Sequence, residues 1–132
     1  MHSARPRDRP FFLWVHLQDP HGPYTPPGIW ADAVEEVPLR PQRALAVLRV
    51  NRGRGGIPAY QALEGILQPS RYAGLYAGEI AFTDHWVGEL LAAVKGDNVV
   101  IALTADHGES LDEDGFFFQH GHTTTPEQAW VP

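Results

Sequence analysis

Two apolar runs and one long periodic segment dominate the hydrophobic pattern of the chain. Residues 11–17 (FFLWVHL) and 99–106 (VVIALTAD) are almost continuously apolar and show no polar alternation. This pattern is typical of parallel strands that are covered on both faces. Over residues 70–95, apolar side chains recur with the 3.6-residue period of an amphipathic helix. A helix that leads directly into an apolar strand indicates a crossover unit, so we expect an α/β fold in which both runs are buried strands.

The remaining segments are less regular. Residues 1–10 are rich in arginine and proline and are expected to be a lead-in. Residues 29–69 read as a variable insertion, with weakly helical patterns at 44–50 and 60–67. Between these two patterns lies a basic, glycine-rich break at residues 52–56 (RGRGG). Although its arginines could bind an anion, we expect a solvated loop and assign them no role.

Composition and charge exclude or disfavour several classes of protein and site. The 132 residues suffice for one domain, and 43% hydrophobic with 20% charged residues describes an ordinary globular protein. With 16 acidic against 10 basic residues, the net charge of -6 argues against a general nucleic-acid surface. The absence of cysteine excludes disulfides, thiolate metal sites and a cysteine nucleophile within these residues. No apolar run approaches the roughly 20 residues of a membrane span, and no signal peptide is visible.

Candidate chemistry follows the second apolar run. Asp106 and His107 stand at its end, and Gly108 lets the backbone turn away. In open α/β sheets, ligands bind at the carboxyl ends of the strands. A carboxylate beside an imidazole at such an edge suits either metal ligation or acid/base chemistry. The alternative is a polar turn in which Asp106 only caps the next helix.

Three further histidines lie beside turn residues. His21 follows the first apolar run in a loop whose prolines make it stiff, and a stiff loop can hold an imidazole in one orientation. His120 and His122 form an H-x-H pair after the phenylalanines at 116–118, which can seat this loop against the core. On an extended segment the two rings would point the same way. His21 could instead only bond a backbone carbonyl, and His120 and His122 could equally be surface residues.

In combination, these segments resemble the sulfatase family of the alkaline phosphatase superfamily. The matching pieces, in the family's order, are FFLWVHLQDPHGPYTPP (11–27), YAGLYAGEIAFTDHWVGELLAAV (72–94), NVVIALTADHGESLDEDG (98–115) and QHGHTTTPEQAWVP (119–132). The resemblance implies a three-layer α/β/α fold with a mostly parallel sheet, here incomplete. It also implies a divalent metal, calcium first and manganese or zinc as alternatives, and hydrolysis of sulfate esters by a formylglycine.

Site residues are carried over by position. Asp106 and His107 match the family's second pair of metal ligands, and His21 matches the loop histidine that contacts the sulfate. Either His120 or His122 falls near the residue that contacts the ester and its leaving group, and spacing leaves the choice open. Many sulfatases have asparagine where His107 stands. Histidine there is common in bacterial-type sulfatases and in phosphonate and phosphate monoester hydrolases.

One departure from the family pattern affects the functional prediction. The nucleophile motif, C/S-x-P-x-R, and the first acidic metal-ligand pair would precede Phe11, and neither is present; Ser3 and Arg5 do not form the motif. We therefore expect residues 1–132 to be a fragment of a sulfatase-like catalytic domain that is inactive alone.

Several functional possibilities stay open on the sequence. The leading one is a metal-dependent sulfuric ester hydrolase acting on a sulfated small molecule or glycan, periplasmic or secreted by analogy with the family. An alternative is a phosphonate or phosphate monoester hydrolase, or a phosphoglycerol transferase, of the same superfamily. From a different class, the chain could be a non-catalytic metal- or anion-binding remnant.

Overall fold

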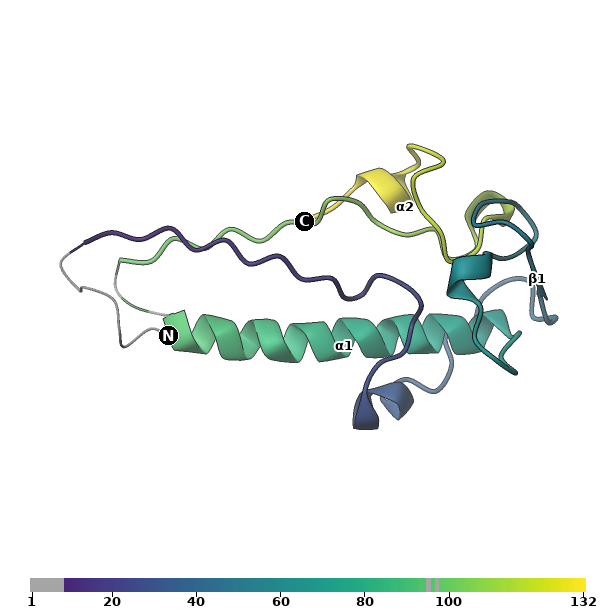
Figure 1. Cartoon of the computed structure of the whole chain (residues 1–132), viewed down its shortest axis with the longest axis horizontal. Coiled ribbons are helices and arrows are strands. Elements are labelled where there is room, and N and C mark those ends of the chain that lie inside the picture. The colour runs from purple at the N-terminus through teal and green to yellow at the C-terminus, as the bar shows by residue number, and fades with distance from the viewer. Residues whose placement is uncertain (1–8, 95, 97) are drawn as a thin grey trace.

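One long helix, α1 (Pro69–Val94), runs the length of the computed structural model (Figure 1). The structure describes residues 9–94, 96 and 98–132, so most of the expected lead-in and Lys95 lie outside the described residues. The other elements are short: β1 (Ala46–Val47), β2 (Gly56–Ile57), α2 (Pro126–Ala129) and the 3-10 turns η2 (Gly28–Asp32), η3 (Ala59–Gln61) and η4 (Glu113–Gly115). None of the described helices is long and apolar enough to cross a membrane.

Helix α1 confirms the helix predicted over 70–95. Only its first half is buried: Tyr72 and Leu75 are 0% and 5% exposed, whereas Ile80 and Trp86 are 45% and 54% exposed. The apolar period continues through both halves, but the rest of the described chain packs mainly against the N-terminal turns. Burial of α1 is therefore decided by its neighbours and not by its own pattern.

Two glycines of α1 allow a neighbouring segment to approach closely. A Cβ on Gly74 would lie 2.6 Å from the carbonyl oxygen of Val34, and a Cβ on Gly78 would collide with that of Trp30. The segment that contains η2 therefore crosses the helix at backbone distance. Arg71 supports this crossing by donating a hydrogen bond to the carbonyl oxygen of Glu35 (3.1 Å).

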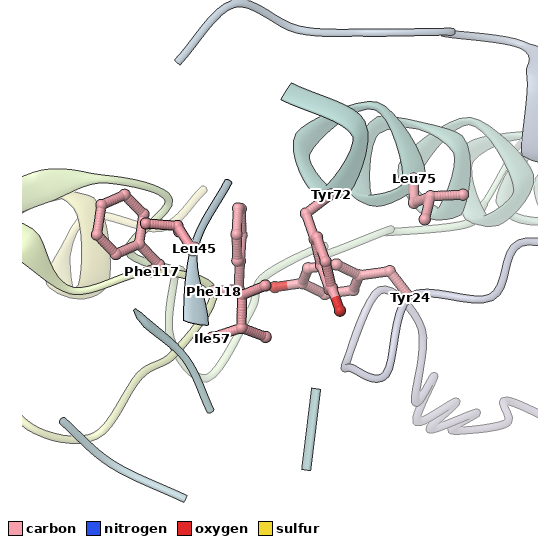
Figure 2. Packing of buried hydrophobic residues seen from close by; sticks show 7 residues of the cluster. All are labelled: Tyr24, Leu45, Ile57, Tyr72, Leu75, Phe117 and Phe118. Atoms are coloured by element: carbon pink, nitrogen blue, oxygen red, sulfur yellow. The ribbon is translucent and has the colours of Figure 1, made fainter. Parts of the chain in front are cut away.

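The core gathers residues from distant parts of the chain around the first turns of α1. Tyr72 stacks on Phe118 with ring centroids 4.9 Å apart, and Tyr24 packs edge-on against Phe118 at 6.2 Å. Figure 2 shows how the cluster closes around these rings. Its members are Tyr24, Leu45, Ile57, Tyr72, Leu75, Phe117 and Phe118. The expected insertion at 29–69 thus contributes directly to the core.

The sheet lies inside that insertion. Strands β1 and β2 pair in parallel, with Ala46 opposite Gly56 and Val47 opposite Ile57. The helix predicted at 44–50 is wrong, because this segment pairs with a neighbouring strand instead. At 60–67 the structure has only the end of η3 and no α-helix. A parallel sheet with helices is consistent with the α/β class.

The two apolar runs predicted as buried strands are not strands in the structure. Residues 11–17 and 99–106 are extended but unassigned to any sheet, and Figure 1 shows both running along α1. Their side chains are exposed, with Phe12 at 86%, Trp14 at 73% and Val100 at 98%. A strand needs a partner for its backbone groups and a layer to cover each face. Within the described residues, neither run belongs to the two-stranded sheet, and most of their side chains remain exposed.

A buried glutamate on α1 leads to a stability prediction. Glu79 is 4% exposed, and its Oε1 accepts a hydrogen bond from the Thr25 backbone N–H (2.7 Å). Burial raises the pKa of Glu79, and the negative charge of Asp19 raises it further. The folded state therefore binds this proton more tightly than the unfolded state. Its contribution to stability is greatest at low pH and is lost as pH rises through the folded-state pKa.

We expect Glu79→Gln to raise the urea midpoint at about pH 7, because the amide keeps an acceptor for Thr25 without a buried charge. At about pH 3, where the carboxyl is protonated in both states, the two proteins should unfold at the same urea concentration. Glu89→Gln, at an exposed position of the same helix, is the control and should shift neither midpoint. A lower midpoint for Glu79→Gln at pH 7 would contradict this account.

Candidate functional site

Three histidines from separate segments meet at one place. The rings of His107 and His120 stack with centroids 3.9 Å apart, and His21 meets His120 edge-on at 5.1 Å. Tyr60 lies next in the row, 6.2 Å from the ring of His21. The structure thus brings together three of the five residues that the sequence singled out.

His107 is positioned by contact between its turn and α2. The backbone N–H of Gly108 donates to the carbonyl oxygen of Gln128 (2.8 Å). A Cβ on Gly108 would collide with the carbonyl oxygen of Glu127, so only glycine permits this approach. The His107 Nδ1 lies 2.8 Å from the carbonyl oxygen of Gly108, which fixes Nδ1–H as the donor. The lone pair of Nε2 therefore remains available.

His120 is held by the core residues that precede it. Phe117 and Phe118 are 3% and 0% exposed, which confirms that the phenylalanines seat this loop against the core. Ser110 and Gln119 exchange backbone hydrogen bonds of 3.1 and 3.3 Å, and both residues are buried. This bridge joins the segment of His107 to that of His120, which explains why their rings meet.

The loop of His21 is tied to the same core. Its backbone N–H donates to the carbonyl oxygen of Gln18 (2.9 Å), and its Nδ1 lies 2.8 Å from the carbonyl oxygen of Gly22. Gly22 packs directly on the side chain of Gln61, where a Cβ would not fit. Gln61 in turn donates to the carbonyl oxygen of Phe118 (3.1 Å). Gln61 therefore connects the His21 loop to the His120 segment.

Glu109 is a site residue that sequence analysis missed. Its side chain is 6% exposed, and its two carboxylate oxygens lie 3.2 Å from His120 Nδ1 and 3.0 Å from the Tyr24 hydroxyl, which donates to it. Burial raises the pKa of Glu109 to about 7. The only sequence signal was its place directly after Asp106-His107-Gly108. With Nδ1–H of His120 donating to Glu109, the Nε2 atom is the one available to a ligand.

His122 lies outside the row of rings that contains His120 and instead contacts Phe116 and Gln128. Its ring lies against Phe116, with centroids 3.8 Å apart, and its Nε2 accepts a hydrogen bond from the Gln128 side chain (3.1 Å). Gln128 also donates to the Ser110 hydroxyl (2.6 Å). The two rings of the H-x-H pair diverge because Gly121 between them has φ of 73°, which breaks the extended geometry.

Asp106 lies beside this row of rings and is largely exposed. Its Oδ1 is 3.8 Å from His107 Nε2, and its side chain is 81% exposed. The electrostatic interaction with His107 lowers the pKa of Asp106. A carboxylate oxygen and a free imidazole nitrogen fit two ligand positions of a divalent cation. Within the described part of the chain, no group of three or more metal-ligating side chains is assembled.

Comparison with known proteins supports the sequence resemblance. The sulfatase family profile matches residues 2–131. An arylsulfatase from Clostridium perfringens is 27% identical over 124 residues, which cover 86% of this chain and 25% of that protein. A sulfatase from Formosa agariphila is 27% identical over 124 residues, covering 85% of this chain and 24% of that protein. The chain thus spans about a quarter of the length of these relatives, and no solved structure gives a significant match. Because the family profile covers nearly the whole sequence, the chain belongs to the sulfatase family.

Proposed function

We propose that this chain supplies the histidine-rich half of the catalytic site of a metal-dependent sulfuric ester hydrolase. The observation that carries the proposal is the row of His21, His107 and His120 rings, drawn from three separate segments. A sulfate ester is an anion that builds further charge on its bridging oxygen as the bond breaks. A cluster of imidazoles suits such a group, because each ring whose Nδ1–H is bonded within the protein can, when protonated, donate its Nε2–H to the anion.

In this proposal Asp106 and His107 hold the divalent metal. When bound, the metal would stabilise negative charge on the sulfate oxygens as a Lewis acid. Calcium prefers oxygen ligands, whereas imidazole suits manganese or zinc. Because Nε2 of His107 is free and faces Asp106, this donor pair favours manganese or zinc alongside the calcium expected from the family.

His21 and His120 contact the ester itself. His21 in its protonated form donates Nε2–H to the sulfate from its fixed loop, and protonated His120 gives its Nε2 proton to the leaving alkoxide as general acid. Burial, with the charges of the neighbouring His107 and His21, lowers the pKa of His120 to about 4. An anionic substrate beside the ring favours the protonated form and so opposes these effects. Glu109 positions the ring, because its carboxylate accepts the Nδ1–H bond and directs Nε2 toward the substrate.

The remaining parts of the site belong to a larger domain in this proposal. We propose a three-layer α/β/α fold in which residues 11–17 and 99–106 become strands of the central sheet. The nucleophile and the first acidic ligand pair would come from residues outside the 132 printed here, so the chain alone would not turn over substrate. A sulfated small molecule or glycan is the substrate class, and a periplasmic or secreted location fits it.

His107 favours a second candidate within the same superfamily. Histidine at this position is also common in phosphonate and phosphate monoester hydrolases, and its site would hold a phosphoryl group in the same way. A non-catalytic anion-binding remnant is the third reading, supported by the absence of a C/S-x-P-x-R motif from the printed residues.

The decisive experiment uses the protein encoded by the complete open reading frame that contains these residues, called the full-length protein below. Its initial rates are measured with para-nitrophenyl sulfate, para-nitrophenyl phosphate and phenyl phosphonate esters, before and after metal removal. We expect the sulfate ester to give the highest kcat/KM, with activity lost on metal removal and restored by added metal. A higher kcat/KM for a phosphorus ester would favour the second candidate. No turnover of any ester, combined with sulfate binding, would favour the remnant.

A further inference from the structure

The arginine-rich loop, residues 52–55, is attached to the segment that carries His120. The side-chain amide of the buried Gln119 accepts a hydrogen bond from the Gly53 N–H (3.1 Å) and donates one to the Gly53 carbonyl oxygen (2.7 Å). Both bonds are made by the residue that directly precedes His120. The backbone of this loop is therefore fixed beside the histidine row, and is not the freely solvated loop that its composition indicated.

The two arginines of this loop make different contacts. The guanidinium of Arg54 lies over the ring of Phe116, 4.8 Å from its centroid. Arg52 instead reaches Gly121: its Nη2 is 3.7 Å from the place where a Cβ on Gly121 would stand. Arg52 is exposed, and no carboxylate in the described part of the chain forms an ion pair with it. Its guanidinium donors are thus available to a ligand.

Arg52 lies near the residues of the row of rings. Its Nη2 approaches Gly121, the residue that directly follows His120. Its charge also acts on Tyr60, whose pKa is raised to about 12, mainly by burial, while Arg52 acts in the opposite direction. Because Tyr60 lies beside His21 in the row, the guanidinium is close to the place where an anion would bind.

We propose that Arg52 binds a second anionic group, a sulfate or a carboxylate, on the same molecule as the ester sulfate held by His21 and His120. Arg52 comes from a different segment and approaches Gly121, the residue after His120, and it is not one of the stacked rings. An anion held by the rings would therefore leave the guanidinium free for a neighbouring group. The planar fork of arginine matches both sulfate and carboxylate with two parallel hydrogen bonds.

This inference rests on the proposed function and narrows its substrate class. The preferred substrates are sulfated molecules with a second negative charge close to the ester, such as a disulfated sugar or a sulfated sugar next to a uronate. The whole chain carries a net charge of -6. The attraction for the second negative charge of the substrate therefore comes from Arg52 and not from the overall charge of the chain.

Two sulfonates test the inference without turnover, because a C–S bond replaces the ester. Benzenesulfonate carries one anionic group, and meta-benzenedisulfonate carries two on the same ring. Titration calorimetry of the full-length protein should show about tenfold tighter binding of the disulfonate, the size expected for one charge-assisted bidentate contact. Arg52→Gln should remove this preference while changing the dissociation constant of benzenesulfonate by less than about twofold. Added salt should reduce the preference in the unsubstituted protein.

Arg49→Gln is the matched control, because it removes the same charge from an exposed position nearby in the sequence. It should leave the disulfonate preference intact. Equal weakening of both sulfonates by Arg52→Gln would mean that Arg52 binds the same anion as the histidines, and would overturn the inference. Equal affinity of the unsubstituted protein for both sulfonates would overturn it as well. Turnover of sulfate esters is measured separately, so a retained preference without turnover would refute the proposed function and still support the Arg52 site.

Discussion

Asp106→Ala in the full-length protein is expected to abolish both ester hydrolysis and binding of the metal at this site. The carboxylate supplies the anionic oxygen of the pair that it forms with His107 Nε2, 3.8 Å away. An imidazole alone would bind a hard divalent cation weakly. Metal content after dialysis and kcat/KM for para-nitrophenyl sulfate are the two measurements. Because the side chain is 81% exposed, the substitution should leave the thermal midpoint nearly unchanged.

His21→Ala separates loss of the metal from loss of substrate contacts. His21 lies edge-on to His120, its Nδ1 is bonded to the Gly22 carbonyl oxygen, and the proposed function assigns it to the sulfate and not to the metal. We expect this variant to keep its metal while sulfate affinity or turnover falls. Unchanged metal content and unchanged turnover in Asp106→Ala would remove the metal assignment entirely.

His120→Gln is expected to reduce kcat for alkyl sulfates by about 10²–10⁴-fold, the usual contribution of a general acid. An alkoxide is a poor leaving group and needs the proton, whereas para-nitrophenolate leaves without it. The loss should therefore be much smaller with para-nitrophenyl sulfate. Comparing the two substrates separates proton donation from simple loss of binding, since a lost sulfate contact would affect both equally.

Glu109→Gln tests whether the glutamate acts through His120. The amide oxygen can still accept from Nδ1–H and the NH2 group can donate to the Tyr24 hydroxyl oxygen, but the side chain no longer stabilises the imidazolium. We expect the same leaving-group dependence as in His120→Gln at a smaller amplitude, with KM little changed. His122→Asn is a useful comparison, because His122 contacts Phe116 and Gln128 and should affect stability more than leaving-group dependence. A uniform loss across all substrates in Glu109→Gln would show a purely structural role.

Local pattern was enough to predict α1 but not the strands. A helix makes its hydrogen bonds within one segment, so a 3.6-residue apolar period over residues 70–95 is a nearly sufficient signal. A strand makes them with a partner segment. Residues 11–17 and 99–106 have the composition of buried strands, yet they stay extended, mostly exposed and outside the sheet. Residues 46–47 show the opposite case: their local pattern is weakly helical, but they form a strand. They do so because β2 lies beside them and pairs with their backbone.

The choice between His120 and His122 was also beyond the sequence. An H-x-H spacing places both rings on one side only if the backbone is extended between them. Gly121 adopts φ of 73°, so His120 joins the row of rings while His122 packs on Phe116. Glu109 was overlooked for a similar reason: its importance depends on burial and on His120, eleven residues further along the chain.

The sequence by itself determined the long helix, the family, and the turn-flanked histidines, because these depend on residue types within short segments. Only the tertiary structure decided which of those histidines meet, how Glu109 is paired, and that Arg52 stands beside them. The physical reason is that these contacts join segments far apart in the chain. Gln61 links the His21 loop to the His120 segment, and Gln119 links that segment to Ser110 and to the arginine-rich loop. Buried amides of this kind must find partners somewhere in the fold, and the local sequence does not specify where.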